Sequence, residues 1–231
     1  REKTITSLLI RLSGPLSHFP SYILYNSSIS ADQHERFGFC KKNRLIIPNG
    51  FDINVFRPQA GVKNNIRGKL GLNTKNIVGH IARYHPKKDH ENLLKAVRLV
   101  VDQVPDTIFL LIGRDVTAAN RRLTKLMEQL RLEGNVRLLG ERTDISRLML
   151  AMDILVSSSA WGEGFPNVIG EAMASGVTCV VTDVGESRSI VGDTGKVVPN
   201  SSPGLIAEAV VGLLELTPED RLDIGRQARE R

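Results

Sequence analysis

The sequence predicts an α/β protein in which helices cover both faces of a parallel sheet. From residue 76 onward, short apolar runs alternate with longer segments whose apolar residues recur at helical spacing. The apolar runs are continuous, as in Thr107-Ile-Phe-Leu-Leu-Ile112, which is typical of strands buried on both sides of a parallel sheet. Glycines and polar residues follow these runs, and ligands bind beyond the carboxyl ends of such strands.

The predicted elements follow one another in a regular order. We predict strands over residues 76–82, 107–112, 135–139, 153–156, 177–182 and 196–198. We predict helices over residues 91–103, 118–132, 145–151, 168–175, 205–216 and 218–230. The first of these helices carries Leu93, Leu94 and Val97 on one face. Gly134 lies just past the second helix, where glycine commonly ends a helix.

Residues 1–52 differ from the rest of the chain because they are irregular and contain several prolines. The elements predicted there are a strand over 23–27, a helix over 29–37, and a strand followed by a turn over 45–50. This is too little to bury a core, so we predict that residues 1–52 end a preceding domain and that residues 53–231 form a second domain. The chain begins at Arg1 and not at methionine, so we expect it to be part of a longer protein.

Composition and charge narrow the class of protein. Hydrophobic residues make up 41% of the chain and charged residues 24%, as in an ordinary globular protein. The net charge is +6, but the basic residues are scattered and form no stripe with interleaved aromatics, so we predict no nucleic-acid partner. The positive charge is either a solvated surface or an attraction for anionic lipid or a phosphorylated substrate. No apolar stretch approaches the roughly 20 residues of a membrane-spanning helix.

Cysteine usage predicts a reducing compartment, so we place the protein in the cytoplasm. Cys40 and Cys179 lie far apart in the sequence, and the chain has neither a disulfide framework nor zinc-ligand spacing. Cys179 lies within an apolar run, so we expect it to be an inert, buried thiol.

Two glutamates eight residues apart form the most informative feature of the chain, Glu163-Gly-Phe-Pro-Asn-Val-Ile-Gly-Glu171. Glu163 lies in a loop after a predicted strand, and Glu171 lies about one turn inside the next helix. Pro166 suits the first turn of that helix because it has no N–H to leave unpaired. Free N–H groups at a helix start attract anions, and carboxylates accept hydrogen bonds from hydroxyls. The run suits a ligand with phosphates and sugar hydroxyls, although each glutamate alone could be a surface acid.

Arg83 and Lys88 follow the first strand of the alternating region and lie five residues apart in one loop. Two such cations can converge on a diphosphate, with a planar fork from arginine and a point charge from lysine. As a basic pair alone they would be solvated loop cations, but their place at a strand's carboxyl end favours the binding role. We assign mainly surface roles to the nearby His85 and His90.

Gly113 and Gly140 end two strands, where they serve turn geometry and allow a ligand to approach the backbone closely. Arg137 and Leu138 could line a pocket for a base, or Arg137 could simply be exposed. The sequence contains no dinucleotide-binding glycine fingerprint, P-loop, nucleophile elbow or metal-ligand spacing. A nicotinamide oxidoreductase is therefore disfavoured.

In these residues the chain resembles the C-terminal half of retaining glycosyltransferases of family four (group 1). These enzymes have the GT-B architecture, and their C-terminal half binds the nucleotide sugar. The landmarks begin at about residue 43 and extend to the end of the chain. They are Ile47-Pro-Asn-Gly-Phe-Asp52, Phe56-Arg-Pro58, Arg83 with Lys88, Leu111-Ile-Gly113, Val136-Arg-Leu-Leu-Gly140, the run from Glu163 to Gly176, Val181-Thr-Asp-Val-Gly185 and Thr194-Gly195. The resemblance implies a Rossmann-like donor-binding domain over 53–231, with 1–52 as a remnant of the acceptor-binding domain and the linker.

The resemblance also implies roles for individual residues. Arg83, Lys88 and Glu163 would be catalytic, with the two cations stabilising the departing nucleotide without a metal or a cofactor. The donor-binding residues would be Gly113, Arg137, Leu138, Gly140, Gly164, Phe165, Asn167, Val168 and Glu171, the last holding the ribose. The implied reaction moves a hexose, with retention, from a UDP- or GDP-sugar to a glycan or lipid-linked acceptor. This would serve surface polysaccharide or glycolipid synthesis, and peripheral contact with the inner face of the membrane is an open alternative.

Three positions depart from the family pattern. Ala82 and Glu186 stand where glycine is common, and Thr178 stands where proline is common. Glu186 adds negative charge near the donor site. Because most of an acceptor-binding domain is missing, we predict that this chain binds nucleotide but transfers sugar poorly or not at all. The alternatives are a non-catalytic nucleotide-sugar module, a GT-B-type epimerase, and a phosphorylase, for which no cofactor lysine site is found.

Overall fold

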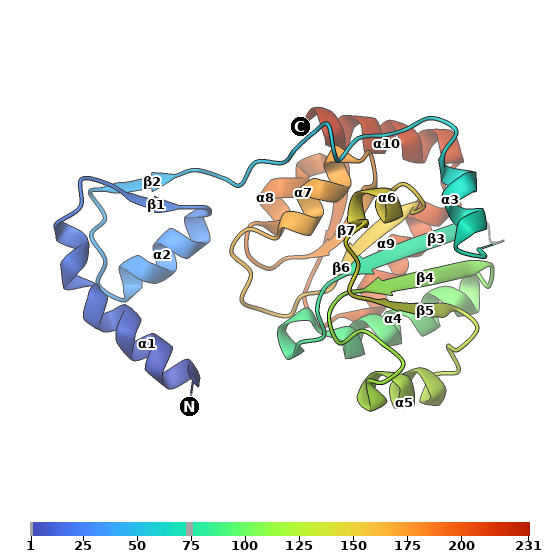
Figure 1. Cartoon of the computed structure of the whole chain (residues 1–231), viewed down its shortest axis with the longest axis horizontal. Helices are drawn as coiled ribbons and strands as arrows, with labels where there is room; N and C mark the ends of the chain where they lie inside the picture. Colours follow the sequence, from blue (N-terminus) through green and yellow to red (C-terminus); the bar gives the residue numbers. More distant parts are fainter. Residues whose placement is uncertain (1, 73–75) are drawn as a thin grey trace.

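The computed structural model describes residues 2–72 and 76–231 (Figure 1). Within this part of the chain, six parallel strands form one sheet in the order β5-β4-β3-β6-β7-β8. The strands are β3 (Asn76–Ile81), β4 (Thr107–Ile112), β5 (Val136–Gly140), β6 (Ile154–Ser157), β7 (Thr178–Thr182) and β8 (Gly195–Val198). The prediction of an α/β fold with a Rossmann-like parallel sheet is confirmed.

Helices cover both faces of this sheet, and each face has its own apolar core. One face packs against α4 (His90–Gln103), α5 (Arg121–Gln129) and α9 (Pro203–Glu215). The other face packs against α6 (Ile145–Met149), α7 (Asn167–Ala174), α8 (Ser187–Val191) and α10 (Pro218–Glu230). Strand side chains alternate between the cores, so that Phe109 and Leu111 face the first core and Leu110 and Ile112 the second.

The strand order creates a crevice at the centre of the sheet. The chain passes from β3 outward to β5, returns to β6 beside β3, and continues outward to β8. The connections after β3 and β6 therefore lead in opposite directions, which leaves a gap beyond the carboxyl ends of these two strands. Figure 1 shows that this end of the sheet faces the N-terminal segment.

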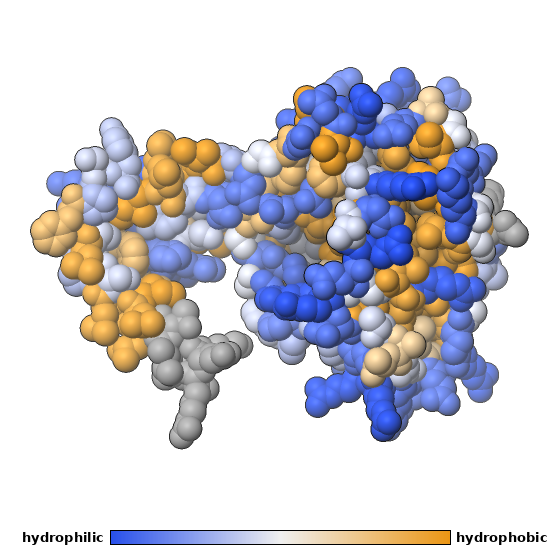
Figure 2. Space-filling model, in the orientation of Figure 1, coloured by the Kyte–Doolittle hydropathy of each residue, from blue (hydrophilic) through white to orange (hydrophobic). Residues whose placement is uncertain are grey.

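The N-terminal segment, residues 2–46, packs as a separate small unit (Figure 1). It comprises α1 (Glu2–Ser13), a 3-10 helix η1 (Pro15–His18), β1 (Ile23–Tyr25), α2 (Ser28–Arg36) and β2 (Arg44–Ile46), with β1 and β2 paired in parallel. Many of its large apolar side chains face solvent, including Leu12 at 64%, Phe19 at 84% and Leu24 at 62% exposure. Figure 2 shows hydrophobic surface over this segment, at the left of the picture. As expected, this segment buries little of its apolar surface.

A linker and a short helix connect the two parts. The linker, residues 47–62, is followed by α3 (Lys63–Lys69), which docks on the end of the sheet opposite the crevice. Lys63 Nζ and Arg67 Nη2 each lie 2.6 Å from a carboxylate oxygen of Asp153, which also accepts the Ile77 N–H. These ion pairs to the buried carboxylate fix the helix, whose sequence is too polar and too short to have been predicted.

Most predicted elements are present, and the differences have local causes. The helix predicted over 118–132 is shorter, because Asn120 caps it by accepting the Leu123 N–H and Arg131 takes a positive φ of 53° after it. The prediction that the first residues are irregular was wrong, since α1 spans Glu2–Ser13, and α3 and α8 were not predicted. Pro166 is the N-cap of α7 and does not lie in its first turn.

Candidate functional site

The loops that follow β3 and β6 meet in the central crevice and join through an ion pair. Lys88 Nζ lies 2.5 Å from Glu163 Oε1, and both side chains are largely buried, at 16% and 8% exposure. Ser159 Oγ donates to the same carboxylate oxygen at 2.8 Å. Burial alone would raise the pKa of Glu163, but the hydrogen bond and charge of Lys88, the hydrogen bond from Ser159 and the charge of Lys87 together lower the pKa below its ordinary value. Glu163 is therefore a carboxylate at neutral pH.

The loop that carries Lys88 is fixed on both sides. It forms the 3-10 turn η2 (Pro86–Lys88), and the Lys87 N–H donates to His85 Nδ1. Ser158 Oγ donates to the Lys88 carbonyl at 2.9 Å, and the Ala160 N–H donates to the Lys87 carbonyl at 2.8 Å. The lysine is thus held by the polar residues at the end of β6, and its ammonium group is directed to Glu163.

Glu171 lies about one turn into α7, as predicted, and is half-buried. Burial raises the pKa of its carboxyl above the ordinary value for glutamate. Among the described residues, the structure gives its carboxylate neither a hydrogen-bond partner nor an ion-pair partner. No side chain caps the first turn of α7, whose N-cap is Pro166. The start of this helix therefore offers N–H groups together with an unused acceptor.

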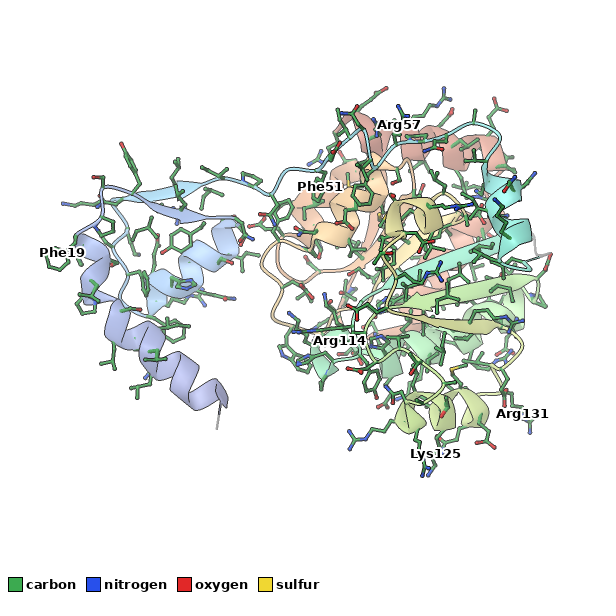
Figure 3. The ribbon with its side chains drawn as sticks, viewed as in Figure 1. Phe19, Phe51, Arg57, Arg114, Lys125 and Arg131 are labelled. Atoms are coloured by element: carbon green, nitrogen blue, oxygen red, sulfur yellow. The ribbon has the colours of Figure 1, made fainter. Side chains whose placement is uncertain are left out.

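Arg83 lies beyond the carboxyl end of β3 and is exposed. It lines a cavity of about 290 Å³ together with Gly113 of the neighbouring strand end and with Arg114, Glu141 and Arg142. Figure 3 shows Arg114 at this end of the sheet, facing the gap toward the N-terminal segment. The cavity combines an exposed guanidinium with strand ends that can be approached closely by a ligand.

Of the two glycines predicted at strand ends, Gly113 lines this cavity and Gly140 is hydrogen-bonded to Gly113. Gly113 has a φ of 149°, and a Cβ added there would lie 2.2 Å from the Ala82 carbonyl oxygen. Its N–H donates to the Gly140 carbonyl at 2.7 Å, and Gly140 has a φ of 67°. Both positions require glycine, one because of the close backbone and both because of the left-handed conformation.

Other predicted site residues lie beside the crevice or away from it. Phe165 stacks on Phe51 of the linker with ring centroids 6.2 Å apart, and Figure 3 shows Phe51 beside α7. Asn167 Oδ1 accepts from Asn49 Nδ2 at 2.6 Å. Val168 packs against the second core and Leu138 against the first.

Arg137 lies away from the carboxyl end of its strand, where the other predicted loop residues gather. It is exposed near the start of β5, three residues before Gly140, which corresponds to about 10 Å along a strand. Its guanidinium donates to the Glu133 carbonyl at 3.1 Å. Its part in a base pocket stays a prediction.

The surface role expected for His90 was wrong, because only 3% of the residue is exposed. It packs edge-on against the buried His80, with ring centroids 4.9 Å apart, below the loop that carries Lys88. Burial lowers the pKa of His80 to about 3 and that of His90 to about 4, so both are neutral at pH 7. Neither supplies charge to the crevice.

Sequence reasoning missed Ser159, and it placed the charge of Glu186 near the donor site without predicting the backbone contact that Glu186 makes to the loop around Glu163. Ser159 donates to Glu163, and its place in the polar run after β6 was the available signal. The Glu186 N–H donates to the Gly164 carbonyl at 3.0 Å, and no local pattern points to that contact. A larger cavity of about 780 Å³ lies between the N-terminal segment and helices α7, α8 and α10, but neither Lys88 nor Glu163 lines it.

Further features bear on cofactors and membranes. Across residues 2–72 and 76–231, no group of three or more His, Cys, Asp or Glu side chains is placed to hold a metal ion. No helix in the same ranges has the length and apolar character needed to cross a bilayer. Cys179 is fully buried, as predicted, and burial raises the pKa of its thiol to about 12, which makes it unreactive.

Comparison with known proteins gives consistent matches. Residues 62–231 match the family model described as "Glycosyl transferases group 1". The chain is 30% identical over 150 residues to the Escherichia coli UDP-Gal:alpha-D-GlcNAc-diphosphoundecaprenol alpha-1,3-galactosyltransferase, covering 63% of this chain and 38% of that protein. It is 32% identical over 190 residues to the Mycolicibacterium smegmatis phosphatidyl-myo-inositol mannosyltransferase, covering 79% and 45%. The chain thus spans less than half the length of these relatives.

Solved structures match all or most of the chain. The crystal structure of Anabaena Alr3699/HepE in complex with UDP and glucose has a TM-score of 0.88 and 26% identity, over 100% of this chain and 63% of that one. The C-terminal domain of a glycosyl transferase group 1 family protein from Francisella tularensis has a TM-score of 0.69 and 25% identity, over 78% and 95%.

Proposed function

The chain belongs to the group 1 glycosyl transferases, and from this we propose that it is the donor-binding part of a retaining hexosyltransferase. The observation that carries the proposal is the Lys88–Glu163 pair in the crevice, with Glu171 one turn into the adjoining helix. A pyrophosphate needs cations and N–H donors, and a sugar needs hydrogen-bond acceptors. The crevice offers both kinds of group side by side.

The proposed roles follow from the position of each group. Arg83 and Lys88 bind the diphosphate of the donor and stabilise the negative charge that develops as the nucleotide leaves. The Glu171 carboxylate, which has no partner among the described residues, accepts hydrogen bonds from the ribose hydroxyls. Glu163 and the N–H groups of Gly164, Phe165 and Asn167 position the transferred sugar and its phosphate. Arg137 and Leu138 remain proposed contacts near the base.

The chemistry proposed for these groups is metal-independent. Two cations at the diphosphate can neutralise the leaving group, so the step draws on electrostatic stabilisation by the side chains themselves. The bond between the anomeric carbon and the phosphate oxygen breaks with its electron pair on the departing nucleotide and leaves an oxocarbenium-like sugar. The acceptor hydroxyl attacks that sugar on the face that the leaving group occupied and gives its proton to the departing phosphate. The contacts of Glu163 with Lys88 and Ser159, which keep it a carboxylate, support the proposal that it orients that sugar.

The nucleotide, sugar and acceptor are proposed by class. The Anabaena structure contains UDP, and the name of the E. coli relative includes UDP-Gal, which together support a UDP-sugar as the donor. A GDP-sugar remains the alternative donor. The galactose, mannose and glucose named in the relatives support a hexose. The diphosphoundecaprenol and phosphatidyl-myo-inositol named in the relatives support a lipid-linked acceptor. We propose that the protein reaches it from the cytoplasmic face of a membrane.

We assign residues 1–52 to the acceptor-binding domain and its linker. The parallel pair β1–β2 and the exposed apolar side chains of Leu12, Phe19 and Leu24 support this assignment, because parallel strands are usually covered on both faces. Transfer needs an acceptor beside the donor, so the chain by itself should bind nucleotide and turn over slowly or not at all. Measurable sugar transfer by the isolated chain would contradict this part of the proposal.

Calorimetric titration of UDP, GDP and ADP tests the proposal. We expect one nucleotide to bind selectively, and we expect Arg83→Ala and Glu171→Ala to weaken it. Binding without any transfer by the full-length protein would favour a non-catalytic nucleotide-sugar module, and conversion of the sugar without an acceptor would favour an epimerase. Absence of nucleotide binding by the full-length protein would overturn the donor site.

A further inference from the structure

Glu186 joins the donor-binding domain to the N-terminal segment. Its Oε1 accepts the Ser28 hydroxyl at 2.6 Å and the Ile29 N–H at 3.2 Å, both in the first turn of α2. Ser27 is the N-cap of this nine-residue helix and accepts the Ser30 N–H. Glu186 and Ser27 therefore satisfy different N–H groups of the same helix start, and the carboxylate also complements the positive end of the helix dipole.

The same residue holds the loop that carries Glu163. The Glu186 N–H donates to the Gly164 carbonyl, and a Cβ on the preceding Gly185 would lie 2.5 Å from the Glu163 carbonyl oxygen. Gly164 in turn faces α2, since a Cβ there would lie 2.8 Å from Ser30 Oγ. The first turn of α2 thus rests directly on the donor loop, with Glu186 bonded to both.

The hydrogen bonds that stabilise the buried Glu186 carboxylate come largely from α2. Glu186 is only 8% exposed, and among the described residues the structure pairs it with no lysine or arginine. The neighbouring Arg188 pairs with Asp183 instead. When α2 moves away, the Glu186 charge can return to water, so the contact can form and break without leaving a buried, unpaired charge.

We propose that Glu186 is a positioning residue that clamps the start of α2 onto the Glu163–Phe165 loop and so holds the two parts of the protein closed around the donor. The inference rests on the proposed transferase function, because closure serves transfer to an acceptor. The contact is specific to a carboxylate at this position, where glycine is common in the family pattern. A glycine there would retain the N–H to Gly164 and lose the bonds to α2.

The test uses the full-length protein with Glu186→Ala, Glu186→Gln and the control Glu208→Ala, an exposed glutamate on α9. We expect Glu186→Ala to keep nucleotide affinity within about twofold, because the cations and Glu171 are unchanged. We expect its kcat for transfer to fall on the order of tenfold to a hundredfold, since small misplacements of reacting groups are costly. Glu186→Gln retains an acceptor oxygen and should recover most of the activity, and Glu208→Ala should resemble the wild type.

Hydrogen exchange of the Ile29 amide tests the clamp independently of catalysis. It should exchange faster in Glu186→Ala and remain protected in Glu208→Ala. Wild-type exchange and wild-type kcat in Glu186→Ala would overturn the clamp, and a loss of nucleotide affinity would place Glu186 in the donor site instead. If the wild type binds no nucleotide, the proposed function fails, whereas the exchange rate still decides whether the clamp exists.

Discussion

Lys88 Nζ lies 2.5 Å from Glu163 Oε1, so the cation assigned to the diphosphate and the carboxylate assigned to the sugar already form a buried pair. The two residues are 75 positions apart in the sequence and come from loops after adjacent strands. Their pairing fixes both side chains before a donor binds. Removing either partner leaves the other as an uncompensated buried charge, which makes the pair sensitive to mutation.

Lys88→Ala should weaken binding of the nucleoside diphosphate by about tenfold to a hundredfold. A charge-assisted hydrogen bond contributes about 1.5–3 kcal/mol, and the variant also leaves Glu163 charged beside the phosphates. Calorimetry with UDP measures the loss. The double variant Lys88→Ala/Glu163→Gln should lose less than the sum of the single variants, because the two side chains are in direct contact.

Lys95→Ala is the control for this series. Lys95 pairs with Glu91 on the exposed surface of α4, away from the crevice. Its removal should leave nucleotide affinity unchanged within error. Additive losses in the Lys88 and Glu163 cycle, or an equal loss in Lys95→Ala, would show that the ion pair has no special part in binding.

Glu171→Ala should weaken UDP binding about tenfold and leave the affinity for 2′,3′-dideoxy-UDP nearly unchanged. The carboxylate is assigned to the ribose hydroxyls, and the dideoxy compound has none to donate. Paired titrations of both nucleotides measure the difference, with Glu208→Ala as a control. An equal loss for both nucleotides would remove the ribose assignment.

The same contact should depend on pH. Burial raises the pKa of Glu171, so its carboxylate is lost at a higher pH than that of an ordinary glutamate. Affinity for UDP-glucose should therefore fall as the pH drops toward the raised pKa, and Glu171→Gln should lack that decline. If the wild type and Glu171→Gln lose affinity in parallel as the pH falls, Glu171 does not have the proposed ribose-binding role.

Gly113→Ala should destabilise the protein by about 2–4 kcal/mol, because the added Cβ meets the Ala82 carbonyl in a left-handed backbone conformation. The backbone cannot move away easily, since the Gly113 N–H is bonded to Gly140. Gly134→Ala is the matched control: no heavy atom lies within 4 Å of the position that a Cβ would take there, so we expect a change within about 0.5 kcal/mol. Urea unfolding measures both values, and equal stability of the two variants would refute the steric argument.

Stability should fall as the pH drops below about 6.5. His80 and His90 have pKa values of about 3 and about 4 in the folded protein, lowered mainly by burial, whereas unfolded histidine titrates near 6.5. Between these values the unfolded chain binds more protons, so each histidine removes about 1.4 kcal/mol of stability per pH unit on acidification. The stability that depends on the two histidines being neutral is fully present above about pH 6.5.

Urea unfolding at several pH values between 7 and 5 measures this slope. The double variant His80→Leu/His90→Leu should show a shallower dependence, and His18→Gln, which alters an exposed histidine in η1, should not change it. A slope that the double variant does not reduce would mean that other groups control acid stability.

Local sequence patterns were sufficient for the architecture and for part of the site. Continuous apolar runs separated by helical periodicity predicted the parallel sheet, because strands buried on both faces have no polar side to alternate with. The spacing from Glu163 to Glu171 predicted one carboxylate in the loop and one about a turn inside α7, since helix geometry fixes that distance. The glycines at 113 and 140 were also recognised, because their strand-end positions demand a backbone that other residues disfavour.

Tertiary structure alone decided which of these groups meet. Strand order brings Lys88 to Glu163, buries His90 beside His80, and leaves Arg137 near the start of its strand. The bond between Glu186 and Ser28 joins residues 158 positions apart, and no periodicity or spacing encodes such a contact. Sequence determines local geometry through short-range sterics and burial, whereas the approach of distant side chains depends on how the sheet, its loops and the N-terminal segment pack together.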